Sequence, residues 1–97
     1  MLVIKTNTNK SLNALVINEK YETGVYTLSI TFSGEIYDLE EVVEVLEEGK
    51  HELNIYHQDK LLNTIVGYNT ISYINKKFIE NVDGLNEQVI ITVNLTK

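Results

Sequence analysis

Histidines are the first residues to consider for metal binding or acid–base chemistry, because imidazole ligates metals and titrates near neutral pH. The chain has two, His51 and His57, in a segment that its apolar spacing predicts to be one strand. Residues at this spacing share a face of a strand but lie roughly 20 Å apart, at about 3.3 Å per residue. They cannot chelate one ion unless the strand folds back, so we predict no metal site.

Other patterns typical of catalysis are missing from the sequence. It contains no glycine-rich phosphate-binding loop, no nucleophile elbow and no H-E-x-x-H pattern. Serines and acidic residues are present, but none stands in a context that identifies a nucleophile and its base. Cysteine is absent, which excludes disulfides and thiolate ligands. We therefore predict a protein that is not an enzyme and that needs no cofactor.

One amphipathic helix is predicted over residues 38–49. Asp38 is a good N-cap, and Glu41 three residues later completes a capping box. Gly49 is expected to end the helix in a left-handed conformation. A buried stripe is predicted from the i, i+3, i+4, i+7 spacing of Leu39, Val42, Val43 and Leu46.

The opposite face of this helix carries five carboxylates: Glu40, Glu41, Glu44, Glu47 and Glu48. A solvated face that favours solubility is the simpler interpretation. The alternative is an acidic patch that mimics an array of phosphates, with Glu40, Glu44 and Glu47 as its contact residues. In that case the protein would be a small acidic inhibitor of a host defence protein or of a nucleic-acid-binding protein.

Aromatic residues provide a further candidate surface, since the chain has six tyrosines. Half-buried positions in a sheet explain tyrosines well, but tyrosine is also favoured at protein interfaces. Tyr68 and Tyr73 flank Ile71 in one short segment. These three residues are our candidates for a protein contact surface, and a sugar-stacking face is the other possibility for the two tyrosines.

Composition limits the partners and the domain count. A chain of 97 residues is one domain, 1–97, and its net charge is −6. All eight basic residues are lysines, so direct binding to nucleic acid is not expected. No apolar run is long enough to cross a membrane, and the N-terminus lacks the features of a signal peptide. We therefore expect protein partners, no membrane and a cytoplasmic location.

Alternating apolar residues predict strands on both sides of the helix. Before it lie 2–6, 12–21 and 25–32, the last joined to its predecessor by a turn at Thr23-Gly24. After it lie 51–57, 61–66, 68–74 and 88–95, with a break at Gly67 and an Asp-Gly loop at 81–86. With 61–66 and 68–74 counted together as one interrupted run, the prediction is an α+β fold with a mainly antiparallel sheet of about six strands and a single helix, in the order β-β-β-α-β-β-β.

Two segments carry a resemblance to a known class of proteins: the G-Y-x-x-I-x-x-I pattern that starts at Gly67, within 67–78, and the terminal strand 89–95. They resemble small acidic proteins encoded in the tail and baseplate modules of Gram-positive siphophages. The resemblance runs from Thr27 onward and brings no catalytic residues with it. It implies a structural or accessory protein that contacts other subunits, copies of itself included, in the host cytoplasm or on the virion.

Overall fold

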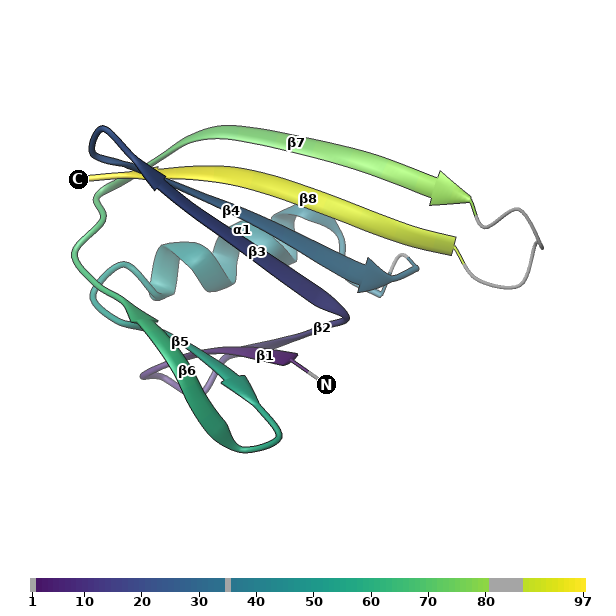
Figure 1. The fold of residues 1–97 in the computed structure, drawn as a ribbon, viewed down its shortest axis with the longest axis horizontal. Helices are drawn as coiled ribbons and strands as arrows, with labels where there is room; N and C mark the ends of the chain where they lie inside the picture. The colour runs from purple at the N-terminus through teal and green to yellow at the C-terminus, as the bar shows by residue number, and fades with distance from the viewer. Residues whose placement is uncertain (1, 35, 81–86) are drawn as a thin grey trace.

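The computed structural model describes residues 2–34, 36–80 and 87–97. Within these ranges the chain forms one helix and eight strands (Figure 1). Their bounds are β1 Leu2–Thr6, β2 Ser11–Ala14, β3 Val16–Glu22, β4 Val25–Ser33, α1 Leu39–Glu48, β5 Leu53–His57, β6 Lys60–Ile65, β7 Thr70–Glu80 and β8 Glu87–Thr96. The α+β class, the single helix and the antiparallel pairing are as predicted, whereas the count of about six strands and their order are wrong.

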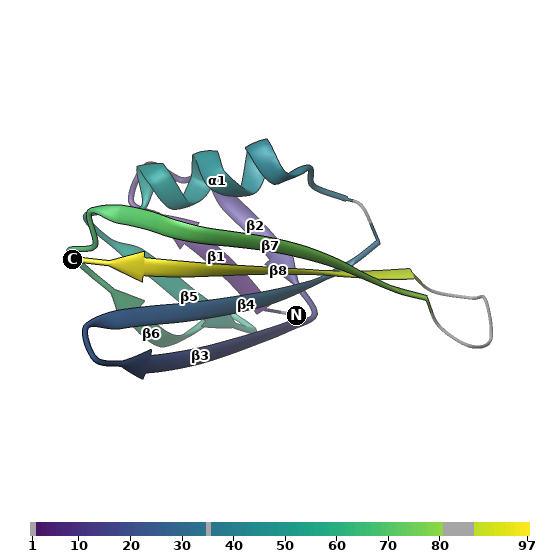
Figure 2. The ribbon, with the colours of Figure 1, turned by 90° about the horizontal axis from the view of Figure 1, so that it is seen from above.

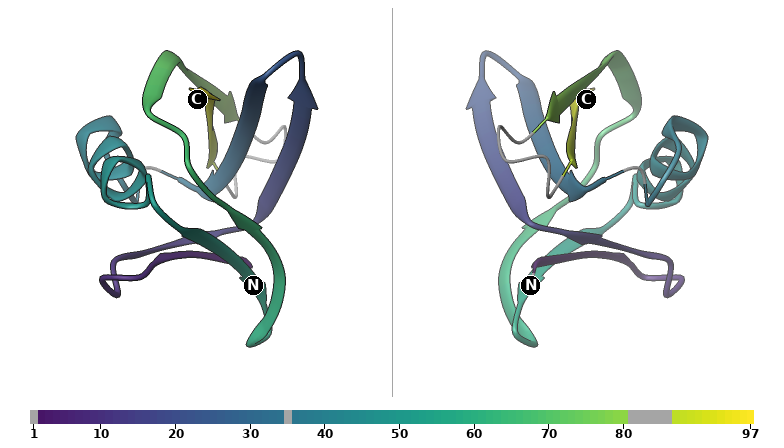
Figure 3. Two further views of the ribbon diagram at one scale, coloured as in Figure 1. Left: turned by 90° about the vertical axis from the view of Figure 1, so that its left-hand side faces the viewer. Right: turned by 90° about the vertical axis from the view of Figure 1, so that its right-hand side faces the viewer.

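The strands form two four-stranded antiparallel sheets. Sheet A has the order β2-β1-β5-β6 and sheet B the order β3-β4-β8-β7. The two sheets face each other with their strands crossing, and α1 lies along one side, near β2 and β7 (Figures 2 and 3). The domain is therefore a small sandwich of two crossed sheets, one side of which is closed by the helix.

Residues 12–21, predicted as one strand, form two strands that belong to different sheets. The chain bends at Leu15, leaves β2 in sheet A and enters sheet B as β3. At the bend the Leu15 N–H donates to the carbonyl of Thr31 at 2.8 Å, and the Leu15 side chain is exposed. A corner between crossed sheets requires such a bend, and an alternating pattern does not reveal it.

The core fills the space between the two sheets. On β4 the residues Leu28, Ile30 and Phe32 are buried, and they pair with Val93, Ile91 and Val89 of β8. Sheet A contributes Ile4, Leu12, Leu53 and Ile55 to the same cluster. The period-two alternation is confirmed along β8, and along β4 except at Thr31, a residue of the other face that is also buried.

The helix begins as predicted but presents a different stripe to the core. The Glu41 N–H donates to the Asp38 carboxylate at 2.7 Å, and the Asp38 N–H donates to the Glu41 carboxylate at 3.3 Å. The buried residues are Val42, Val45 and Leu46, whereas Leu39 and Val43 are only partly buried. The helix lies in the angle between the sheets and contacts β1 and β2, so its position determines which stripe faces inward.

Gly49 ends the helix, but without the predicted left-handed conformation. Its φ is −82°, and its N–H donates to the carbonyl of Val45 at 2.9 Å. A Cβ at this position would lie 2.6 Å from Cδ1 of Leu53. Glycine is needed here because the helix end packs closely on β5, not because of its backbone dihedrals.

The break at Gly67 is confirmed, with a φ of +74° between β6 and β7. β7 continues to Glu80, six residues beyond the predicted end at Ile74, because it pairs with β8 along its length. The predicted Asp-Gly loop at 81–86 lies outside the described residues. In the part of the chain that the structure describes, no helix has the length and apolar character needed to span a membrane.

Candidate functional site

Sheet B ends in two edge strands, β3 and β7. Within the described residues β3 pairs only with β4, and β7 pairs only with β8. The outward N–H and C=O groups of both strands thus have no strand partner in this part of the chain. Such edges are templates for pairing with another chain.

Most of the large exposed apolar residues come from two strands that lie across from α1 and from the connections next to those strands. Six of the eight within the described residues belong to this set: Leu15, Val16, Tyr21, Leu61, Leu62 and Val66. They come from β3, β6 and the adjoining connections, and both strands lie across from the helix (Figure 3). We call this the open side. Grouped exposed apolar residues are typical of surfaces that bind other proteins.

A small polar cluster bridges the two sheets at the open side. The Tyr26 hydroxyl donates to the Glu19 carboxylate, and the Asn63 amide donates to Glu19 at 2.6 Å and to the Tyr26 oxygen at 3.0 Å. Partial burial raises the pKa of the Tyr26 hydroxyl, and the Glu19 carboxylate raises it further. Tyr26 therefore keeps its proton at neutral pH, and the cluster fixes the position of the Glu19 side chain on edge strand β3.

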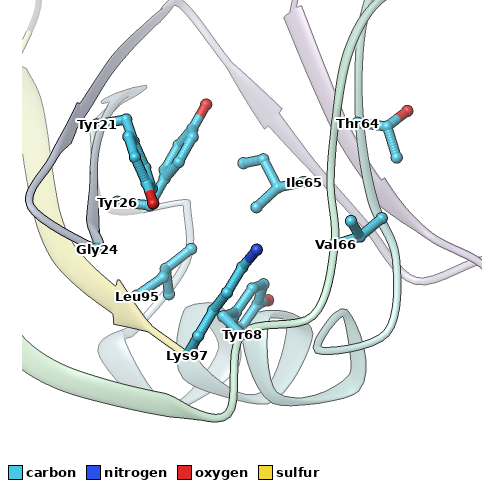
Figure 4. A pocket seen from close by; sticks show the side chains of 9 residues that line it. All are labelled: Tyr21, Gly24, Tyr26, Thr64, Ile65, Val66, Tyr68, Leu95 and Lys97. Atoms are coloured by element: carbon cyan, nitrogen blue, oxygen red, sulfur yellow. The ribbon is translucent and has the colours of Figure 1, made fainter.

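A cavity of about 250 Å³ opens beside this cluster (Figure 4). Its walls are mainly aromatic and aliphatic, and the Lys97 side chain reaches into it beside Ile65 and Tyr68. The volume is below the roughly 300 Å³ at which ordinary ligand sites begin. Among the described residues that line it, the titratable side chains are those of Tyr21, Tyr26, Tyr68 and Lys97.

The predicted contact surface of Tyr68, Ile71 and Tyr73 is not supported by the positions of the described side chains. Tyr68 is 2% exposed, and its hydroxyl donates to the carbonyl of Leu46 in the helix. Burial raises the pKa of Tyr68, and the nearby Glu47 carboxylate adds to this. The prediction that Tyr68 is a surface residue is wrong, because the turn at Gly67 directs it beneath the helix end.

The other two residues of that prediction have different outcomes. Ile71 is partly buried and packs against the core. The side chain of Tyr73 is outside the described part of the structure, although its backbone pairs with Asn94. Neither residue therefore demonstrates a contact surface.

The acidic face of α1 is partly neutralised by lysines of the same chain. The amino group of Lys10 forms ion pairs with Glu44 and, at 3.0 Å, with Glu48, and Lys50 pairs with Glu47 at 2.6 Å. Glu44 and then Glu48 raise the pKa of Lys10. Two of the three predicted contact residues, Glu44 and Glu47, are thus already paired, while Glu40 is exposed.

Both histidines are exposed, and His51 precedes β5 instead of lying within it. Among the described residues no three His, Asp or Glu side chains form a group that could hold a metal ion.

Sequence reasoning anticipated pairing at exposed strand edges but did not identify β3 and β7 as the edges. Alternating apolar residues identify a strand but do not show whether that strand lies at the edge or in the centre of a sheet. One signal was available: the only adjacent basic pair of this acidic chain, Lys76-Lys77, lies on β7. Lysine is a frequent residue of edge strands.

Comparison of the chain with protein-family models, curated proteins and solved structures found no match. Its own surfaces are therefore the basis for assigning a function.

Proposed function

We propose that this chain is a non-enzymatic structural or accessory subunit that acts through protein–protein contacts, copies of itself included. The resemblance to proteins of siphophage tail and baseplate modules gives the proposed setting. The observation that carries the proposal is the pair of open edges on sheet B. A subunit with two open edges can bind one neighbour on each side, which is what a repeating assembly requires.

The neutral outer face of sheet B supports the same function. Its central strands carry few charges, with none in β4 and only Glu87 in β8. Polar groups on this face bond to one another: Thr27 to Asn94 at 2.8 Å and Ser29 to Thr92 at 3.1 Å. A neutral face whose polar groups are already satisfied loses little when a neighbour removes it from water.

β7 also has features that restrict pairing to a matching partner. A register shift between Ile71 and Tyr73 interrupts its ladder with β8, and two adjacent lysines follow. Bulges and lysines are common means of preventing indiscriminate edge association. A specific neighbour must offer residues that complement them.

The test is the absolute molar mass in solution, measured by light scattering after size exclusion over a series of concentrations. We expect a mass above the 11.1 kDa of one chain, increasing with concentration toward a defined multiple. A monomer at every concentration would contradict self-association. The acidic helix face would then be the surface to test, by comparing partner capture by the wild type with capture by the E40Q/E44Q/E47Q variant.

A further inference from the structure

We infer that the neighbour of sheet B is a second copy of this chain, bound head to tail with β3 of one copy beside β7 of the next. This inference rests on the proposed function and names its partner and its surface. Three observations support it: the directions of the two edge strands, the residues that they carry, and the exposed apolar side chains on them.

The strand directions allow a continuous antiparallel sheet. Every neighbouring pair in the order β3-β4-β8-β7 is antiparallel, so β3 and β7 run in opposite directions. Copies related by rotation about an axis along the strands keep the same orientation. The β3 strand of one copy then meets the β7 strand of the next antiparallel, which is the pairing found throughout sheet B.

One register matches the residues of the two edges. It places Glu19 opposite Lys76 of the neighbour and Ile17 opposite Phe78. On the other face it places Val16 opposite Ile79. Opposite charges and apolar pairs facing each other across strands stabilise a sheet. Among the other pairs of this register, Asn18 faces Lys77 and Lys20 faces Asn75, so no like charges meet there.

Neighbouring registers lack this match. A register can change only in steps of two residues if the inner face of each strand is to stay on the inner side. Glu19 and Lys76 share that side, because they pair with the buried residues Leu28 and Ile91. A step in either direction puts an apolar residue opposite Glu19, and Ile17 then faces a charged residue, Lys76 or Glu80.

The pairing would also cover apolar surface on both edges. Val16 on β3 is 45% exposed and Phe78 on β7 is 52% exposed, and each would acquire an apolar neighbour. The Glu19 carboxylate is held by hydrogen bonds from Tyr26 and Asn63, so its position is set before a neighbour arrives. Pre-positioning of this kind lowers the entropy lost on binding.

The proposed register sets a constant offset between copies. Residue pairs across sheet B connect Glu19 to Leu28, Leu28 to Val93, and Val93 to Ile74. Glu19 is therefore level with Ile74 of its own sheet, and pairing with Lys76 moves the neighbour by two residues, about 6.6 Å along the strands. A regular offset of this kind tilts the strands, as closure of a sheet requires.

Exchange of charges tests the contact between Glu19 and Lys76. Glu19→Lys and Lys76→Glu should each weaken association of the single variant by roughly tenfold. An equimolar mixture of the two variants should recover association, in open chains or even-numbered rings in which the variants alternate, because only interfaces between unlike variants join opposite charges. Failure of the mixture to recover, with both variants folded by circular dichroism, would overturn the proposed contact.

Cysteine pairs test the register without relying on charge, since the chain has no cysteine of its own. Asn18→Cys combined with Lys77→Cys should form, on oxidation, a reducible ladder of dimers, trimers and larger species. Asn18→Cys with Asn75→Cys is the matched control; its cysteines would be offset by two residues, and we expect at least about tenfold less cross-linking.

The results separate this inference from the proposed function. If the wild type is a monomer at all concentrations, self-association is wrong and this inference fails with it, while the proposed function is still tested by capture of a different partner. If the wild type associates but both cysteine pairs cross-link equally, only the head-to-tail register is wrong. The same holds if the pair Asn18→Cys with Lys77→Cys does not cross-link.

Discussion

The two sides of the sandwich are closed in different ways. On the helix side, Val42 and Leu46 are fully buried and the Tyr68 hydroxyl bonds to the helix end. On the open side, the sheets are bridged by Asn63 with Glu19 and Tyr26, and Tyr21 remains 64% exposed. Burial on the helix side stabilises the fold, whereas the open side leaves apolar surface for a partner.

This difference predicts that a leucine-to-alanine substitution destabilises the fold strongly on the helix side and hardly at all on the open side. Leu46→Ala would leave a cavity in a fully buried site and should lower the free energy of unfolding by about 2–5 kcal/mol. Leu62→Ala, at a residue 54% exposed on the open side, should change it by less than about 0.5 kcal/mol. Urea denaturation of both variants measures the two losses of unfolding free energy. Similar losses would contradict the proposed difference between the two sides.

A smaller effect is expected where the helix ends on β5. Gly49→Ala would place a methyl group 2.6 Å from Cδ1 of Leu53 and 3.2 Å from the Tyr68 hydroxyl. Overpacking of this kind typically costs about 1–3 kcal/mol. Thermal or urea unfolding gives the loss. Adding Leu53→Val should recover part of it, and strictly additive effects would show that the contact is not the cause.

The tyrosines allow a matched comparison of single hydroxyl groups. Tyr68→Phe removes the hydrogen bond to the Leu46 carbonyl and should cost about 1 kcal/mol in unfolding free energy. Tyr21→Phe on the open side should have little effect, because Tyr21 is exposed. Equal losses in urea denaturation would mean that the buried hydroxyl contributes nothing specific.

The smallest expected effect concerns the ion pairs above the helix. The hydrogen bond from Lys10 lowers the pKa of Glu48. The stability that the ionised Glu48 carboxylate adds to the fold is therefore present above pH 4.5 and is lost as the pH falls. The pKa of Lys10 is raised, so the stability that its charged amino group adds to the fold is present below pH 10.5 and is lost as the pH rises. Lys10→Gln should therefore lower the melting temperature slightly between these limits and flatten its decrease toward acid.

Salt provides a control for that prediction. The pairs are exposed, so high ionic strength should reduce the difference between the wild type and Lys10→Gln. Lys60→Gln, an exposed lysine in the β5–β6 hairpin, serves as the matched variant. An equal change in its pH profile would assign the effect to net charge instead of the Lys10 pairs.

Local patterns predicted the elements whose causes are local. The capping box of Asp38 and Glu41, the alternation of β4 and β8, and the break at Gly67 depend on residues close together in the chain. Features that depend on distant contacts were missed. Tyr68 was expected at the surface and Val43 in the core, because neither the fold of the Gly67 turn nor the position of the helix is encoded in local spacing.

The sequence by itself determined the class of the fold, the single helix with its N-terminal cap, and the inner faces of the central strands. These follow from propensity, capping and periodicity, which act over a few residues. Tertiary structure alone decided that residues 12–21 divide between two sheets and that β3 and β7 become edges. Edge positions depend on which strands find partners, and pairing joins residues as distant as Val25 and Thr96.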